Sequence, residues 1–247
     1  VQADITWLED GTPYCEHFQD IYFSTADGVA EAEYVFLKHN QFPQRFTYKQ
    51  SLTIGETGFG TGLNFLVTAF HWLKQTECFF TTPSLKYISV EKYPLSWQQL
   101  HRVYQFFKQR WPDLSDLCNR LLSQYPGEIQ SLGLSASPVE IKLPGQGQMT
   151  LVLCLGDAAK RLESLTSEYQ RDIDAWYLDG FAPTKNQSMW TSELFTQIAR
   201  LSHTDTTLST FTSAGDVRRG LINAGFNIKK AKGFGIKREM LYGAFTR

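Results

Sequence analysis

Hydrophobic positions along the chain recur with two periods, one typical of buried strands and one typical of helices. Short apolar runs predict five buried strands, at 52–54, 87–90, 151–155, 175–178 and 208–211. Apolar residues at helical spacing come after each run, and they predict helices at about 61–74, at 94–111, after Asp157, at 189–201 and at 214–224. Strand and helix therefore alternate from residue 52 onward.

The two ends of the chain depart from this alternation. Residues 5–8 and 14–18 flank an Asp-Gly turn, which predicts a hairpin, and 21–24 is a further extended piece before a helix at 28–38. At the other end, two strands at 227–231 and 240–245 have no helix between them. We expect these last strands to form an antiparallel hairpin at one edge of the sheet.

Residues between the second and third buried strands are mostly helical by pattern. Pro94 stands at a position that favours helix initiation, and an aromatic stripe from Trp97 to Trp111 is typical of core packing. The helical pattern continues over 112–125. Residues 126–147 read as a loop-rich connection.

These elements predict an α/β fold, a Rossmann-like doubly wound and mostly parallel sheet. Ligands of such sheets bind beyond the carboxyl ends of the strands, at the switch point of the strand order. The turn after the first buried strand is therefore where a binding site is expected.

Three glycines, Gly58, Gly60 and Gly62, occupy this turn, two residues after Glu56. The dinucleotide motif G-x-G-x-x-G does not fit, because its third glycine would fall on Leu63. A carboxylate beside the turn would repel a pyrophosphate but would suit a ligand with a cationic end. S-adenosylmethionine, which has an ammonium group, a sulfonium centre and no phosphate, is favoured over NAD.

Two more acidic residues follow buried strands. Glu91 ends the second strand, where a carboxylate can accept both ribose hydroxyls. Asp157 follows the third strand and can accept from an adenine amino group, with Gly156 allowing close approach. Asp157 can equally be a helix N-cap, and that alternative stays open.

The fourth strand leads into Asp179-Gly-Phe181-Ala-Pro183, an acid, an aromatic and a proline in a loop. Methyl transfer to nitrogen needs a neutral amine held in line with the methyl group. Asp179 can orient that amine or accept its proton, and Phe181 can pack on a base or on the sulfonium. A helix cap and a core aromatic are the alternative.

Composition narrows the class of protein. No apolar run in the 247 residues reaches membrane-spanning length, and the four cysteines lack metal-like or disulfide-framework spacing. We expect reduced thiols, a cytoplasmic location, no metal and no membrane contact. The net charge is −1, yet residues 216–247 hold eight basic residues against two acidic ones. That asymmetry fits either a polyanionic partner or a solvated sheet edge.

Long motifs carry a family resemblance that runs from about residue 5 to residue 245. Its strongest parts are Glu56–Leu66, Trp176–Asn186, Thr210–Gly215 and Gly233–Met240. With these motifs the chain resembles the methyltransferase part of the MnmC family, bacterial bifunctional tRNA 5-methylaminomethyl-2-thiouridine biosynthesis proteins.

The resemblance implies a class I S-adenosylmethionine-dependent methyltransferase domain at 49–247 and a small N-terminal extension at 1–48 that packs on the substrate side. It implies methylation of the aminomethyl nitrogen of a tRNA wobble uridine. An FAD-dependent oxidoreductase domain follows in two-part members. The chain stops at Arg247, so we expect a stand-alone enzyme or one half of such a protein.

The resemblance also implies site residues. For the cofactor they are Glu56, Gly58, Phe59, Gly60, Gly62, Asn64, Glu91, Lys92, Asp157, Ala158 and Asp179. For catalysis they are Asp179 and Phe181. For the tRNA anticodon arm they are Tyr22, Phe23, Tyr34, Pro183, Lys185, Arg218, Arg219, Lys237 and Arg238.

Three other functions stay open from the sequence. The same fold can act on a small-molecule or protein amine, which a flat response to salt would indicate. An NAD-dependent oxidoreductase would bind NAD and not S-adenosylmethionine. A non-catalytic RNA-binding module would bind tRNA without cofactor affinity.

Overall fold

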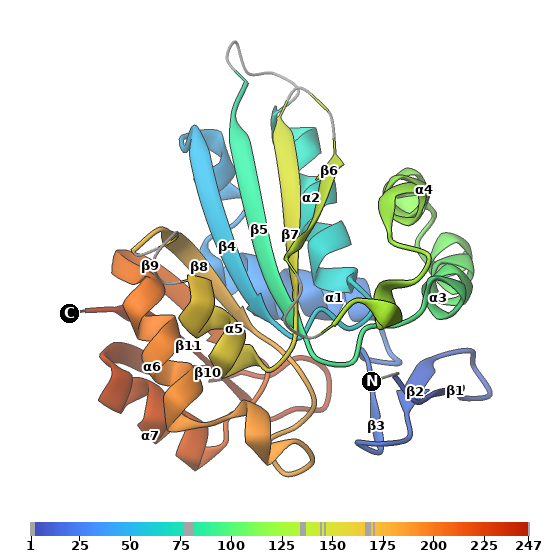
Figure 1. Ribbon diagram of the computed structural model, residues 1–247. Coiled ribbons are helices and arrows are strands. Elements are labelled where there is room, and N and C mark those ends of the chain that lie inside the picture. The colour runs from blue at the N-terminus through green and yellow to red at the C-terminus, as the bar shows by residue number, and fades with distance from the viewer. Residues whose placement is uncertain are drawn as a thin grey trace.

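The computed structural model describes residues 3–76, 82–133, 137–143, 145, 147–165, 169 and 171–246. Its centre is a sheet with the strand order β10-β11-β9-β8-β4-β5-β7-β6 (Figure 1). Five of these strands are parallel: β4 (Ser51–Thr57), β5 (Ser84–Glu91), β7 (Gln148–Leu155), β8 (Ile173–Leu178) and β9 (Ser202–Thr210). All five were predicted, and each is longer than its apolar run.

Antiparallel strands complete both edges of this sheet. β10 (Phe226–Lys232) and β11 (Glu239–Phe245) form the predicted hairpin, and β11 pairs with β9. At the opposite edge β6 (Val139–Leu143) pairs with β7. The prediction of a loop-rich connection at 126–147 was wrong for this strand, because Val-Glu-Ile-Lys-Leu alternates as an edge strand does over only five residues.

Helices cover both faces of the sheet, which confirms the doubly wound fold (Figure 1). One face carries α5 (Ala158–Leu165), α6 (Ser192–Leu201) and α7 (Gly215–Ala224). The other carries α2 (Leu63–Thr76), α3 (Trp97–Arg110) and α4 (Ser115–Gln124). α3 begins three residues after Pro94, because Ser96 and Gln99 form a capping box there.

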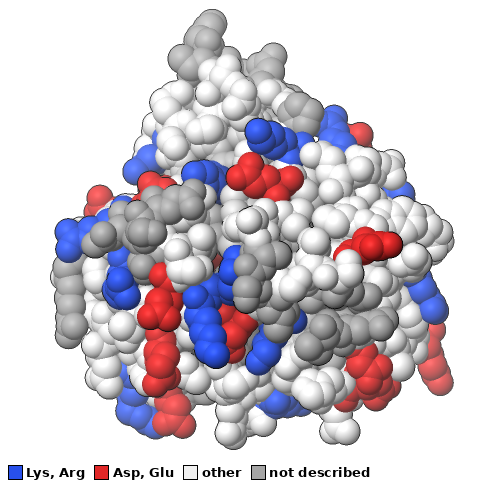
Figure 2. Space-filling model, viewed as in Figure 1, with Lys and Arg blue, Asp and Glu red and all other residues white. Residues whose placement is uncertain are grey.

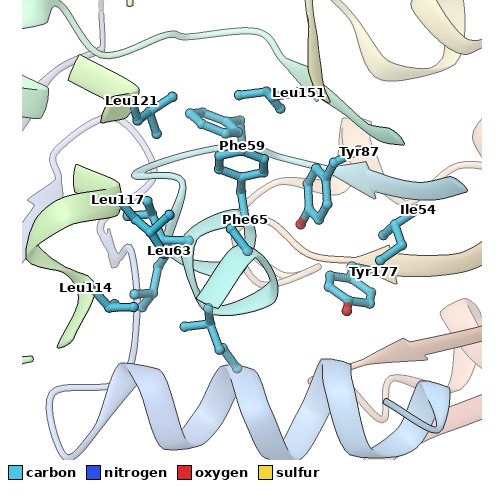
Figure 3. Packing of buried hydrophobic residues seen from close by; sticks show 14 of the residues in the cluster. Ile54, Phe59, Leu63, Phe65, Tyr87, Leu114, Leu117, Leu121, Leu151 and Tyr177 are labelled. Carbon is cyan, nitrogen blue, oxygen red and sulfur yellow. The ribbon is translucent and has the colours of Figure 1, made fainter. Parts of the chain in front are cut away.

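Aromatic and leucine side chains pack together in the core on the α2 face (Figure 3). Tyr87 of β5 and Tyr177 of β8 come from the two strands that flank β4, and their rings lie 6.0 Å apart. Phe65 on α2 meets Tyr87 at 5.3 Å. Leu117 and Leu121 of α4 join the same cluster. This packing fixes the start of α2, and with it the turn between β4 and α2.

The N-terminal segment has two parts. β1 (Ile5–Trp7), β2 (Pro13–Cys15) and β3 (Asp20–Ile21) form a small antiparallel sheet with the predicted hairpin. α1 (Gly28–Ala32) then continues through a π-helical turn at Glu33–Leu37 and 3-10 turns at Lys38–Asn40 and Gln44–Thr47.

This second part is built into the main core. Phe36 stacks on Tyr177, and Phe46 meets Trp72 of α2 edge-on. Asn40 donates to Ser209 of β9, and Arg45 donates to Thr207. Over the residues described, no helix is long and apolar enough to cross a membrane.

Candidate active site

A cavity of about 700 Å³ opens at the carboxyl ends of the parallel strands. Its wall includes Gly58 after β4, Glu91 at the end of β5, Gly156 after β7 and Asp179 after β8. β4 is the strand at which the order reverses, since β5 lies on one side of it and β8 on the other. The cavity therefore lies at the switch point, as predicted, and has a size typical of small-molecule sites.

The glycine turn brings bare backbone to the cavity. Gly58 and Gly62 have φ of +86° and +74°, in the left-handed region that favours glycine. A Cβ on Gly62 would lie 2.7 Å from Phe59 Cζ, and one on Gly58 would lie 3.2 Å from the carbonyl oxygen of Asp179. The turn is anchored to β5, because the Gly58 N–H donates to the Val90 carbonyl over 2.9 Å.

Glu91 is held in a fixed orientation at the end of β5. One carboxylate oxygen accepts the Gly60 N–H over 2.8 Å, and the other accepts the Tyr93 N–H over 2.7 Å. Burial raises the pKa of Glu91, while these backbone donors oppose that shift. Each oxygen keeps a lone pair for a ligand, so Glu91 can still accept hydroxyl donors from the cavity.

Asn64 connects two carboxylates beneath the cavity. Its Nδ2 donates to Glu56 Oε1 over 3.0 Å and to Asp179 Oδ2 over 2.7 Å, which uses both amide hydrogens. Ser89 donates to the other oxygen of Glu56 over 2.6 Å. Of the described residues, Asn64 and Asp179 line the cavity and Glu56 lies below it, 1% exposed.

Burial dominates the electrostatics of this group. It raises the pKa of Glu56 to about 8, and the nearby Asp179 adds to the shift. It raises the pKa of Asp179 to about 6, against the Gly180 N–H and Asn64, which stabilise the ionised form. At neutral pH Asp179 is mostly ionised and Glu56 mostly neutral, so the two carboxyl groups differ in charge although one side chain joins them.

Asp157 lies at the start of α5 with Ala158 beside it in the cavity wall. Its Oδ2 lies 3.6 Å from Lys92 Nζ, and its Oδ1 accepts the Lys160 N–H over a long 3.5 Å. A weak cap bond leaves the carboxylate partly available. Both interpretations of Asp157, cap and ligand contact, are compatible with this geometry.

Aromatic rings form a further part of the cavity wall. Phe181 stacks on Phe18 with ring centroids 4.7 Å apart, and Tyr22 meets Phe181 edge-on at 5.3 Å. Trp190 Nε1 donates to the Phe181 carbonyl over 3.0 Å and fixes this loop. Phe181 thus lies on the cavity wall with Asp179, and its packing on a base or on the sulfonium stays a prediction.

A family profile described as S-adenosyl-L-methionine-dependent methyltransferase matches residues 112–246, which include β7, β8 and both acidic residues that follow them. The chain belongs to this family. The methyl donor of this family, S-adenosylmethionine, is cationic and carries no phosphate. It therefore suits a cavity wall that holds the carboxylates of Glu91, Asp157 and Asp179.

Relatives of the methyltransferase are similar over nearly its whole length. It is 44% identical over 245 residues to the tRNA 5-methylaminomethyl-2-thiouridine biosynthesis bifunctional protein MnmC of Vibrio vulnificus (strain YJ016), covering 98% of this chain. The protein of that name from Pseudomonas entomophila (strain L48) is 44% identical over 247 residues, covering 99% of this chain. The methyltransferase spans 35% of the length of these relatives.

Solved structures support the fold. MNMC2 from Aquifex aeolicus superposes with a TM-score of 0.73 at 21% identity, over 98% of this chain and 69% of that one. Spermidine synthase from Thermotoga maritima superposes with a TM-score of 0.58 at 11% identity, over 100% of this chain and 72% of that one. At these identities the likeness is one of fold.

The cavity wall fits S-adenosylmethionine. Its described residues offer exposed backbone at Gly58 and Gly60, and carboxylates at Glu91, Asp157 and Asp179 for hydroxyl, amino or cationic groups. Other predicted cofactor residues on the wall are Phe59, Asn64, Lys92 and Ala158. The predicted residues Glu56 and Gly62 lie outside this wall, and their part in cofactor binding stays a prediction. Glu56 would have to act through Asn64, which donates to it.

The predicted tRNA-binding residues are scattered. Phe23, Tyr22 and Lys237 line the cavity, but Phe23 also packs on Phe106, Phe107 and Trp111 in the core. Tyr34 donates to the Lys232 carbonyl over 2.8 Å, outside the cavity wall. Pro183, Arg218, Arg219 and Arg238 also lie outside that wall.

Both lysines proposed for phosphate contact have acidic partners in the N-terminal segment. Lys185 Nζ lies 3.1 Å from Asp20 Oδ1, and Lys237 Nζ lies 2.8 Å from Glu31 Oε1. Arg219 pairs with Asp216. On the face in Figure 2, basic and acidic side chains lie side by side in the region of α5–α7. Phosphate contact by these residues stays a prediction.

The cavity wall also includes residues that the sequence did not reveal as site residues, among them His17, Phe18, Glu31 and Tyr93. The sequence singled out Tyr22 and Phe23 in the N-terminal segment, but not the neighbouring His17, Phe18 and Glu31. Glu31 meets a residue 206 positions away, and no local pattern reports such a contact.

Proposed function

We propose that this methyltransferase transfers a methyl group from S-adenosylmethionine to the aminomethyl nitrogen of a 5-aminomethyl-(2-thio)uridine at the tRNA wobble position. The observation that carries the proposal is the position of Asp179. It stands on the cavity wall between the glycine turn and the aromatic loop, in a chain similar to relatives named for this modification.

When bound, the cofactor supplies a methyl group on a positively charged sulfur. The protein must hold the acceptor amine in line with that methyl group and exclude water. Asn64 fixes one oxygen of Asp179, and the Gly180 N–H fixes the other over 2.8 Å. With its pKa near 6, Asp179 is ionised at neutral pH and can orient the amine and accept its proton. Phe181 and Phe18, which stack on each other on the same cavity wall, would help to exclude water from the bound amine.

We propose the same organisation for this chain as for the relatives. Residues 49–247 would be the methyltransferase domain, and residues 1–48 an extension on the substrate side that supplies Phe18, Tyr22 and Glu31 to the cavity. The relatives are bifunctional, and the FAD-dependent oxidoreductase activity would belong to a separate, fused domain. The anticodon arm of tRNA would be the partner, in the cytoplasm.

Nucleoside mass analysis tests this function. Incubation with S-adenosylmethionine and tRNA bearing 5-aminomethyluridine should convert that nucleoside into the methylaminomethyl form. Asp179→Ala and Asp179→Asn should each lower the rate by about 10²-fold or more, because general acid–base and orienting contacts are worth that much. Asp113→Asn, an exposed acid on a 3-10 turn, is the matched control. Full activity of both Asp179 variants would remove this residue from catalysis.

A small-molecule or protein amine is a second candidate acceptor. It is favoured by the ion pairs of Lys185 and Lys237, which leave these lysines engaged within the protein. Binding of tRNA should weaken steeply as salt rises, since phosphate contacts release counterions. A flat salt response would support the small acceptor instead.

A further inference from the structure

The cavity can be divided by strand order into two parts that lie on either side of Asp179. The glycine turn, Glu91 and Gly156 lie over β4, β5 and β7 on one side. On the other side, beyond β8, the wall is formed by the end of β9, by the turn between β10 and β11, and by α1. We call the second part the acceptor lobe, defined by Glu31, Phe211, Phe234 and Lys237.

An ion pair crosses the acceptor lobe. Glu31 Oε1 on α1 lies 2.8 Å from Lys237 Nζ on the β10–β11 turn, and Glu31 Oε2 accepts the Ser24 N–H over 3.1 Å. The Glu31 side chain is only 13% exposed, whereas that of Lys237 is 43% exposed. Glu31 is thus the fixed member of the pair and Lys237 the member that can reach solvent or another anion.

The surroundings of the pair suit a flat ring with a cationic substituent. Lys237 Nζ lies 4.4 Å from the centroid of Phe211, and Phe234 lies on the same wall. The charged groups that face Glu31 are Lys237 from the turn and Asp179 from β8. The carboxylates of Glu31 and Asp179 face the single ammonium group of Lys237, which leaves one negative charge in this part of the cavity. The alkylammonium group of a substrate would neutralise that charge.

We propose that Glu31 is a second acceptor-binding carboxylate, which receives the amine of the substrate when Lys237 turns from Glu31 to a phosphate of the same substrate. The proposal rests on the function proposed above. It adds that the acceptor is recognised in its ammonium form, by a carboxylate from the N-terminal segment.

The chemistry balances with no additional reactant. The acceptor enters as R-NH₃⁺, and one proton moves from its nitrogen to a carboxylate of Glu31 or Asp179. The freed nitrogen lone pair forms the bond to the methyl carbon, the carbon–sulfur bond breaks, and its electron pair stays on sulfur. The product leaves as R-NH₂⁺-CH₃, and the carboxylic acid returns its proton to water.

Glu31→Gln tests the role with little change of shape, because the amide oxygen can still accept the Ser24 N–H. Its matched control is Glu33→Gln, which removes an equal charge from the adjoining helical turn, where Glu33 pairs with His71 over 2.7 Å. The assay is methyl transfer to an anticodon stem-loop RNA carrying 5-aminomethyluridine.

The KM for RNA should rise about tenfold in Glu31→Gln at pH 7, and the difference should shrink towards pH 9.5 as the amine loses its charge. The Kd for S-adenosylmethionine, measured by calorimetry, should stay within about twofold, because Glu31 belongs to the acceptor lobe and not to the part of the cavity beside the glycine turn. The Glu33→Gln control should match the wild type. An unchanged KM, or an increase independent of pH, would overturn the role.

A charge swap tests whether Glu31 binds the substrate or only forms a structural ion pair with Lys237. In Glu31→Lys/Lys237→Glu the pair is kept but the carboxylate moves to the exposed turn. If the pair only closes the cavity, the swap restores the activity lost in either single variant, and the proposal fails. If Glu31 binds the amine, the swap stays impaired. A wild-type enzyme inactive on this RNA would refute the proposed function itself, whereas an active wild type with an equally active Glu31→Gln would refute only the role of Glu31.

Discussion

Glu56 shows at the scale of one residue how the site affects stability. It is 1% exposed, and burial raises its pKa from an ordinary 4.5 to about 8. Between these two values the folded state binds a proton that the unfolded state has released. The contribution of this bound proton to the free energy of unfolding is therefore fully present below 4.5, the pKa in the unfolded state. It is lost as the pH rises through about 8, the pKa in the folded state.

Glu56→Gln should remove this pH dependence. Between about pH 6.5 and pH 8.5 the wild type should lose on the order of 1–2 kcal/mol of unfolding free energy relative to the variant. Asp179 contributes little in this window, because its pKa is near 6 and its ionisation is largely complete there. Urea unfolding of both proteins at the two pH values measures the difference. Parallel changes in the two proteins would show that Glu56 does not titrate in this range.

At the scale of single residues, the sequence predicted which types of residue lie at the site better than it predicted the contacts between them. Acids at strand ends were predicted from the order of elements, and Glu91, Asp157 and Asp179 do line the cavity. The link from Glu56 through Asn64 to Asp179 was not predicted, since it joins three elements in space. The ion pairs of Lys185 and Lys237 were missed for the same reason.

At the scale of an element, the β4–α2 turn depends on backbone shape. Gly62→Ala should be destabilising, because φ is +74° there and the new Cβ would lie 2.7 Å from Phe59 Cζ and 3.1 Å from the Tyr104 hydroxyl. The cost should be about 1–3 kcal/mol, with a cofactor Kd raised about tenfold or more. Thermal unfolding and calorimetric titration measure the two effects.

Gly127→Ala is the control for this change, because a Cβ there meets nothing within 4 Å and φ is not in the left-handed region. It should leave both the melting temperature and the cofactor Kd unchanged. If Gly62→Ala bound the cofactor normally, the conformation of the turn would not be needed for binding.

Elements were predicted well where burial was strong and less well at the edges. The apolar cores of β4, β5, β7, β8 and β9 identified the strands, but their polar ends, such as Ser202–Thr206 in β9, carried no apolar signal. β6 was missed because an edge strand exposes alternate polar residues. Pro94 was assigned to α3, although the capping box at Ser96 sets the start of that helix.

At the scale of the whole molecule, residues 28–47 and the sheet share one core. Phe46 is 0% exposed and belongs to the same cluster of buried side chains as Ile54 of β4 and Tyr177 of β8. Phe46→Ala should therefore destabilise the entire chain by about 3–5 kcal/mol in a single transition. Tryptophan fluorescence and circular dichroism, followed through the same urea titration, should coincide.

Tyr48→Ala is the matched control, since Tyr48 is 62% exposed two residues further along the chain. It should change stability by no more than about 0.5 kcal/mol. Two separate transitions in Phe46→Ala would instead mean that residues 1–48 unfold as an independent unit, closer to the extension that the sequence suggested.

The two-lobed cavity has a stereochemical consequence. If donor and acceptor bind on opposite sides of Asp179, as we propose, both are bound at once. The methyl carbon then moves directly from sulfur to nitrogen in a single displacement, with no methylated protein side chain as an intermediate. A methyl group made chiral with hydrogen, deuterium and tritium should therefore arrive on nitrogen with its handedness reversed.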